Sequence, residues 1–179
     1  MTPAHPQLTR LPHRGPFLPR SEPIIPLRRA TGISIIGGGL ALVSFDYLDP
    51  PDLRLDAYVN VVWEPLDGSQ LSIVHLLVRL SRFMESKGIG RAHLRLPGGQ
   101  MASLFPAVMR HMVAAVHAIV DVNIRDVADA SVRSWVLAQG PHVNMANIPS
   151  DDALSRKLLQ SAAETAIYAA SNPTPRVAS

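Results

Sequence analysis

Three consecutive glycines, Gly37 to Gly39, follow a short apolar segment and raise the first question of chemistry in this chain. A glycine-rich loop between a strand and a helix can hold a phosphate at the helix N-terminus. Here the next residues are LALVSF (40–45), which have no N-cap residue and are typical of a second strand. No Lys-Ser or Lys-Thr pair follows the glycines, which excludes a P-loop. The glycines are therefore predicted to form a hairpin turn, where positive φ costs glycine little.

Other reactive residue types lack the spacing that catalysis needs. His111 and His117 are six residues apart, which puts them on opposite faces of a helix and gives no metal-ligand pair. No G-x-S-x-G motif surrounds a serine, and Ser131 is predicted to be a helix N-cap. Arg133 is a candidate phosphate contact, whereas Trp135 beside it is predicted to lie in the core. The chain has no cysteine, so thiolate chemistry and disulfides are excluded.

The composition predicts one globular domain with a basic N-terminal arm. The chain has 179 residues, of which 47% are hydrophobic and only 17% charged. Residues 1–30 contain seven prolines, five arginines and a single acid, Glu22, so the positive charge of the chain is concentrated there. Prolines at this density block helices, and we expect an extended, disordered arm over 1–30, a domain over 31–171 and a disordered tail over 172–179.

The arm suggests the partners of the chain. Its arginines could contact nucleic-acid phosphates, an anionic surface or an acidic protein. The candidate nucleic-acid contacts are Arg10, Arg14, Arg20, Arg28, Arg29 and, within the domain, Arg133. No uninterrupted apolar stretch is long enough for a membrane span, so no membrane partner is expected. No secretory signal is recognisable, which favours a cytoplasmic location. The low charged fraction is consistent with an apolar surface covered in a homo-oligomer or a larger assembly.

The elements that must position these residues form a mixed α/β pattern. Three strands are predicted first, over 32–36, 40–47 and 55–64, followed by a helix from Ser69 to about Lys87. A strand over 91–96, a helix over 101–120 and a strand over 122–127 come next. Two helices end the domain, one from 130 or 131 to 138 and one from 151 to about 170, which Ser150 could cap. This order predicts a mixed five-stranded sheet with helices on both faces.

The same order, together with four short sequences, resembles the RuvC-like resolvase branch of the RNase H-like superfamily. GISIIGGGLALVSFDYLD (32–49) is similar to the strand, tight turn and second strand with which those proteins begin. SRFMESKGIGRAHLRL (81–96) resembles their helix and fourth strand, and VNIRDVADASVRSWVLAQG (122–140) resembles their fifth strand and following helix. SDDALSRKLLQSAAETAIYAAS (150–171) is similar to their alanine-rich last helix.

The resemblance implies phosphodiester hydrolysis with two metal ions held by carboxylates. It places one acid in the turn after the first strand, where this chain has Gly37 to Gly39, and another at the end of the fourth strand, where it has Arg95, Leu96 and Pro97. Of the acids that the resemblance expects, only C-terminal candidates remain: Asp151, Asp152 and Glu164.

Three functions are consistent with these observations. The first is a catalytically degenerate RuvC-like or RNase H-like domain without a cofactor, which binds nucleic acid or a protein partner. The second is an active Mg²⁺-dependent endonuclease of the resolvase type, whose catalytic acids lie at other positions than those assigned above. The third is a structural or assembly protein of a larger complex. The two empty acid positions favour a protein that is not an enzyme.

Overall fold

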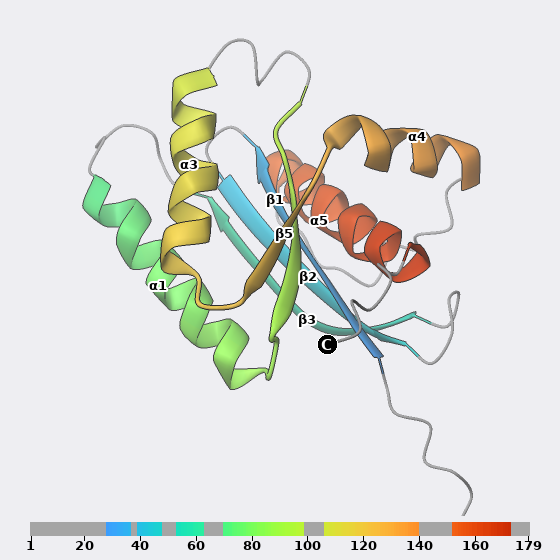
Figure 1. The fold of residues 1–179 in the computed structure, drawn as a ribbon, viewed down its shortest axis with the longest axis horizontal. Helices are drawn as coiled ribbons and strands as arrows, with labels where there is room; N and C mark the ends of the chain where they lie inside the picture. Colours follow the sequence, from blue (N-terminus) through green and yellow to red (C-terminus); the bar gives the residue numbers. More distant parts are fainter. Residues whose placement is uncertain are drawn as a thin grey trace, which may run out of the picture.

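The structure, a computed structural model, describes residues 28–36, 39–47, 53–62, 70–98, 106–139 and 152–172. Within them a sheet is flanked by helices on both faces, as Figure 1 shows. The elements in chain order are β1 (Arg28–Ile36), β2 (Gly39–Tyr47), β3 (Leu53–Val62), α1 (Gln70–Ser86), β4 (Arg91–Arg95), α3 (Pro106–Ile119), β5 (Asn123–Val127), α4 (Asp129–Gln139) and α5 (Ala153–Ser171).

The five-stranded sheet has the order β3-β2-β1-β4-β5. β1, β2 and β3 form an antiparallel meander, and β1 pairs with β2 from Arg28 opposite Tyr47 to Ile36 opposite Gly39. β4 runs parallel to β1, and β5 runs parallel to β4. Because β1 and β4 are parallel neighbours, their C-terminal ends meet at the same edge of the sheet, where ligands of α/β proteins commonly bind.

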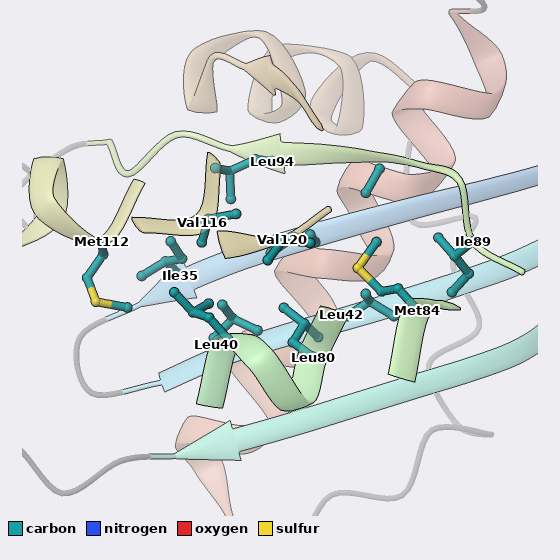
Figure 2. Close-up of a cluster of buried hydrophobic side chains, with 13 residues drawn as sticks. Ile35, Leu40, Leu42, Leu80, Met84, Ile89, Leu94, Met112, Val116 and Val120 are labelled. Carbon is teal, nitrogen blue, oxygen red and sulfur yellow. The ribbon is translucent and has the colours of Figure 1, made fainter. Parts of the chain in front are cut away.

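One face of the sheet is covered by α1 and α3 (Figure 1). Alternate residues of β1, β2 and β4 point toward these helices, as the period of two in a strand requires. Figure 2 shows how these side chains meet those of α1 and α3 in a single apolar layer. Its fully buried members include Ile33, Leu42, Leu77, Leu94 and Met112.

The other face packs against α5, which lies directly on β1. The contact is so close that a Cβ on Gly32 would lie 2.1 Å from the carbonyl oxygen of Ala162 and 2.5 Å from the backbone nitrogen of Ala166. Alanines on α5 make the same approach possible from the helix side, and Ala162, Ala163 and Ala166 are fully buried. β1 is therefore held between two apolar layers, and its C-terminal end has a fixed position relative to α5.

The predicted order of elements and the mixed five-stranded sheet are confirmed. The hairpin interpretation of the glycines is supported, since β1 ends at Ile36 and β2 begins at Gly39, so no helix follows the turn. At least one positive φ is predicted among Gly37 to Gly39; Gly39 is the first residue of β2, and Gly37 and Gly38 lie outside the described residues. No described helix is long and apolar enough to cross a membrane.

Several predicted boundaries were wrong. β1 begins at Arg28 rather than residue 32, so the last residues of the expected arm belong to the sheet. α4 begins at Asp129, which places Ser131 in the first turn of the helix instead of at its N-cap. α5 is capped by Asp152 and not by Ser150. Trp135 is half-buried against the α5 core and meets the ring of Tyr168 edge-on, with 6.0 Å between ring centroids.

Candidate functional site

A pocket of about 520 Å³ opens where the C-terminal ends of β1 and β4 meet α4 and α5. Its walls combine apolar side chains with charged ones from elements far apart in the sequence. The apolar lining consists of Ile35, Ile36, Leu96, Pro97, Val136 and Leu137. The polar lining consists of Ser34, Arg95, Asp129, Arg133, Lys157, Gln160, Ser161 and Glu164, and Gly98 completes the wall.

Arg95 enters this pocket because of the alternation along β4. Ala92 and Leu94 point into the apolar layer under α1 and α3, so Arg95 must point to the α5 face. It lies opposite Ser34 in the parallel pairing of β1 and β4. Its side chain is only 8% exposed. A charge at that depth is stable only when it is paired, and Arg95 is paired twice.

Two carboxylates share the guanidinium of Arg95. Its Nε donates to Oδ1 of Asp129 at 2.7 Å, and its Nη1 donates to Oε2 of Glu164 at 2.8 Å. Both carboxylates are themselves largely buried, with side chains 16% and 15% exposed. These two ion pairs join β4 to the first residue of α4 and to the middle of α5. Charge-assisted hydrogen bonds of this kind are shorter and stronger than neutral ones.

The remaining carboxylate oxygens of the pocket are also satisfied. Oδ2 of Asp129 forms an ion pair with Nε of Arg133 at 2.7 Å, four residues along α4. Oε1 of Glu164 accepts from Nε2 of Gln160 at 3.1 Å, one turn earlier on α5. Each of the four carboxylate oxygens of Asp129 and Glu164 thus has a nitrogen partner from the same pocket, three through hydrogen bonds and one through an ion pair.

The pocket face of α5 follows from helical spacing. Lys157, Gln160, Ser161 and Glu164 are three or four residues apart, which places them on one side of the helix. The hydroxyl of Ser34 on β1 donates to Oγ of Ser161 at 2.7 Å, so this side of α5 is tied directly to the end of β1.

Gly98 allows the chain beyond β4 to pass over Asp129. A Cβ at this position would lie 2.5 Å from Oδ2 and 2.6 Å from Cβ of Asp129. The backbone nitrogen of Leu96 donates to the carbonyl oxygen of Val127 at 2.9 Å, so the segment runs beside the end of β5. Glycine is therefore needed where the chain approaches the Arg95 ion pairs.

The predicted catalytic acids do not come together. Asp151 lies outside the described residues. Asp152 is exposed and caps α5, accepting hydrogen bonds from the backbone nitrogen of Ser155 at 2.8 Å and from its hydroxyl at 2.6 Å. The side-chain hydrogen bond from Ser155, followed by the backbone one, lowers the pKa of Asp152. Glu164 lies twelve residues further on, about 18 Å along the helix axis, where it pairs with Arg95.

The described residues therefore do not fit a two-metal centre. Such a centre needs several carboxylates with oxygens free to coordinate Mg²⁺. The pocket offers two carboxylates, both already bonded to cationic or amide nitrogens. Across the ranges that the structure describes, no group of three or more His, Cys, Asp or Glu side chains is placed to hold a metal ion.

The predicted nucleic-acid contacts are dispersed. Arg10, Arg14 and Arg20 lie outside the described residues. Arg28 is exposed at the start of β1. Arg29 forms ion pairs with Asp46 at 2.9 Å and Asp56 at 3.2 Å and donates to the carbonyl oxygen of Lys87, which ties β1 to its neighbours.

Among the predicted contacts that the structure describes, Arg133 lies in the pocket, and its side chain is 62% exposed.

No protein-family model matches the chain, and no curated protein matches it in sequence. Solved structures do match. Thermus thermophilus RuvC in complex with a Holliday junction substrate superposes with a TM-score of 0.63 and 13% sequence identity, over 80% of this chain and 93% of that one. A second structure of T. thermophilus RuvC gives a TM-score of 0.62 and 14% identity, over 81% and 95% of the two chains.

This chain has the RNase H-like fold in its RuvC-like form. The resemblance seen in the sequence is thereby confirmed at the level of the fold. In this RuvC-like domain the pocket lies at the ends of β1 and β4 beside the last helix, the place where the resemblance implied a carboxylate cluster. The residues there are Ser34, Ile35 and Ile36 on β1 and Arg95 on β4.

Sequence reasoning missed Asp129 and the role of Arg95. Asp129 directly precedes the predicted helix start, and in the structure it is the first residue of α4, where an acidic side chain is favoured by the helix dipole. The position of Arg95 in the sequence could have indicated a buried ion pair. An arginine on the inward-facing side of a central strand must have a buried partner, because arginine is almost never buried unless paired.

Proposed function

We propose that this chain is a RuvC-like domain that lacks two-metal nuclease catalysis and binds nucleic acid. The observation that carries the proposal is the Arg95 guanidinium, held between Asp129 and Glu164 where the fold would otherwise gather metal-binding acids. A fixed cation repels a divalent metal and uses the same carboxylate oxygens that the metal would need.

Nucleic-acid binding is supported by charge. The formal net charge of the chain is +3, and five arginines lie in residues 1–30. At the pocket, Arg133 and Lys157 are both exposed. Cations on an exposed surface attract phosphates and release counterions, so the binding depends strongly on salt.

A cleavage and binding experiment tests the proposal. Purified protein is incubated with a Holliday junction, a linear duplex and an RNA–DNA hybrid in Mg²⁺ or Mn²⁺, beside an active resolvase as a positive control. We expect no cleavage of any substrate. In fluorescence anisotropy without metal, we expect binding that weakens steeply between 50 and 200 mM salt.

Matched variants separate the contributions. Replacing Arg10, Arg14 and Arg20 together by glutamine should weaken binding of all nucleic acids alike, as expected for phosphate contacts. Metal-dependent cleavage that disappears in Asp152→Asn or Glu164→Gln would refute the proposal and establish an active nuclease.

A second candidate, an assembly protein, is favoured by one observation. The side chain of Leu137 is 85% exposed at the rim of the pocket, an unusual position for a large apolar residue. Light scattering of the protein alone and with DNA distinguishes the two. A stable oligomer that Leu137→Gln dissociates, without any DNA binding, would favour the assembly role.

A further inference from the structure

We propose that the pocket between β1, β4, α4 and α5 receives one unpaired nucleotide of a single strand, with its phosphate at the cationic rim and its base against the apolar wall. This inference rests on the proposed nucleic-acid binding and names its substrate class. It also requires no metal ion.

The charge of the pocket favours a phosphate. Three cationic side chains line it, Arg95, Arg133 and Lys157, against the two carboxylates of Asp129 and Glu164. The three hydrogen bonds and the ion pair described above direct all four carboxylate oxygens toward nitrogens of the protein. The formal charge of the lining is thus positive, while its acids are turned toward the protein.

The positions of the cations favour a ligand at the rim. Arg95 is buried and serves to hold the two acids, whereas Arg133 is 62% exposed and Lys157 is exposed on α5. The two exposed cations come from different helices and face the same opening. A phosphate between them would meet charge from both sides without being taken out of solvent.

The apolar wall favours a base next to that phosphate. Leu96 and Pro97 beyond β4 and Val136 and Leu137 on α4 line the same cavity as the rim cations. Unpaired bases bind between apolar or aromatic side chains, because the faces of the ring gain by leaving water. The volume of about 520 Å³ lies within the range typical of pockets for small organic ligands.

This combination selects a single strand over a duplex. In a duplex the bases are stacked and paired, and a base can reach such a pocket only after it is extruded at a cost of a few kcal/mol. A single strand presents its bases without that cost. A surface that recognises only phosphates would bind both forms, so strand preference is the property that distinguishes the pocket from a general basic surface.

The test measures anisotropy of a labelled twelve-nucleotide dT strand and of a labelled twelve-base-pair duplex, both in EDTA. Wild-type protein should bind the single strand at least about fivefold more tightly than the duplex. Leu137→Gln should weaken single-strand binding about fivefold or more and leave duplex binding unchanged, as expected when a base contact is lost. Val74→Gln, at an apolar residue 42% exposed on α1, is the matched control and should change neither.

The double variant Arg133→Gln/Lys157→Gln tests the rim. It should weaken single-strand binding and reduce the slope of log affinity against log salt by roughly 0.7, the value for one phosphate contact on a single strand. Arg79→Gln/Arg82→Gln, which removes two exposed arginines from α1, is the control and should leave the slope unchanged. Thermal melts establish that each variant is folded.

The outcomes separate this inference from the proposed function. Equal binding of single strand and duplex, insensitive to Leu137→Gln and to the rim variant, would overturn the pocket and leave nucleic-acid binding in place. No binding of either nucleic acid by the wild-type protein would overturn both.

Discussion

Replacing Arg95 by methionine is expected to destabilise the domain strongly. Methionine retains much of the length of the side chain but removes the charge and both ion pairs. Breaking a buried ion pair by removing one partner typically costs 3–5 kcal/mol, because the other charge stays buried without compensation. That range applies here because the side chains of Arg95, Asp129 and Glu164 are all less than a fifth exposed.

The expected value lies at the lower end of this range. Asp129 keeps its second partner, Arg133, and Glu164 keeps the amide of Gln160. We therefore expect a loss of about 3 kcal/mol in the free energy of unfolding. With a urea dependence of about 2 kcal/mol per molar, the midpoint should fall by about 1.5 M. Circular dichroism during urea titration measures this shift.

A second substitution checks the physical reason. In Arg95→Met/Glu164→Gln the uncompensated carboxylate becomes a neutral amide, so part of the lost stability should return. The resulting double-mutant cycle should give a coupling energy of about 1–3 kcal/mol between the two residues. A loss below about 1 kcal/mol in Arg95→Met, or a double variant no more stable than Arg95→Met, would refute the role of Arg95 as the central cation of the pocket.

Three further substitutions are expected to affect stability. Gly32→Ala should cost about 3 kcal/mol, the upper end of the range for overpacking, because the added Cβ meets the backbone of α5; a urea midpoint close to that of the wild type would contradict this. Burial, and then the charges of neighbouring arginines, lower the pKa of His93, so the unfolded chain binds a proton first as pH falls below about 6.5. Stability should fall from pH 7 toward pH 5, and His93→Gln should remove this part of the dependence in melts across that range. The pKa of Asp152 is lowered by its hydrogen bonds, so its contribution is present above the ordinary aspartate pKa and is lost as pH falls through the native value. Asp152→Asn should differ less from the wild type at acid pH than at pH 7, and an equal difference at both would count against this cap.

The fold was predictable because its signals are local. LALVSF (40–45) after the glycines indicates a strand and no helix, and this alone separates a hairpin from a phosphate loop. The alternation in RAHLRL (91–96) and the spacing of alanines in the last helix identify which faces are buried. Each of these patterns depends on a few neighbouring residues and on the period of the backbone.

The boundaries were less predictable because tertiary contacts decide them. Arg28 and Arg29 look like part of a proline-rich basic segment, but pairing with β2 continues through them as far as Tyr47. The ion pairs of Arg29 with Asp46 and Asp56 join three strands at this point. Nothing local to the arginines distinguishes a strand from an arm.

The site was the least predictable part, because its contacts span the chain. Arg95 is 34 residues from Asp129 and 69 residues from Glu164 in the sequence. The resemblance implied Glu164 as a catalytic candidate together with Asp152. In the structure Asp152 caps α5, and Glu164 is not beside it. The parallel register of β4 and β5, which puts Arg95 opposite Val127, and the docking of α5 bring the three charges together.

The charge in the pocket links stability to the proposed lack of two-metal catalysis. Two buried carboxylates that face one cavity repel each other unless a cation lies between them. A metalloenzyme can supply that cation as a bound ion, which is then available to polarise a substrate. Here the cation belongs to the chain itself and is held on both sides, so the same contacts that stabilise β4, α4 and α5 leave the carboxylates without free oxygens. What remains open to a ligand is the outer rim, where the exposed side chains are cationic and apolar.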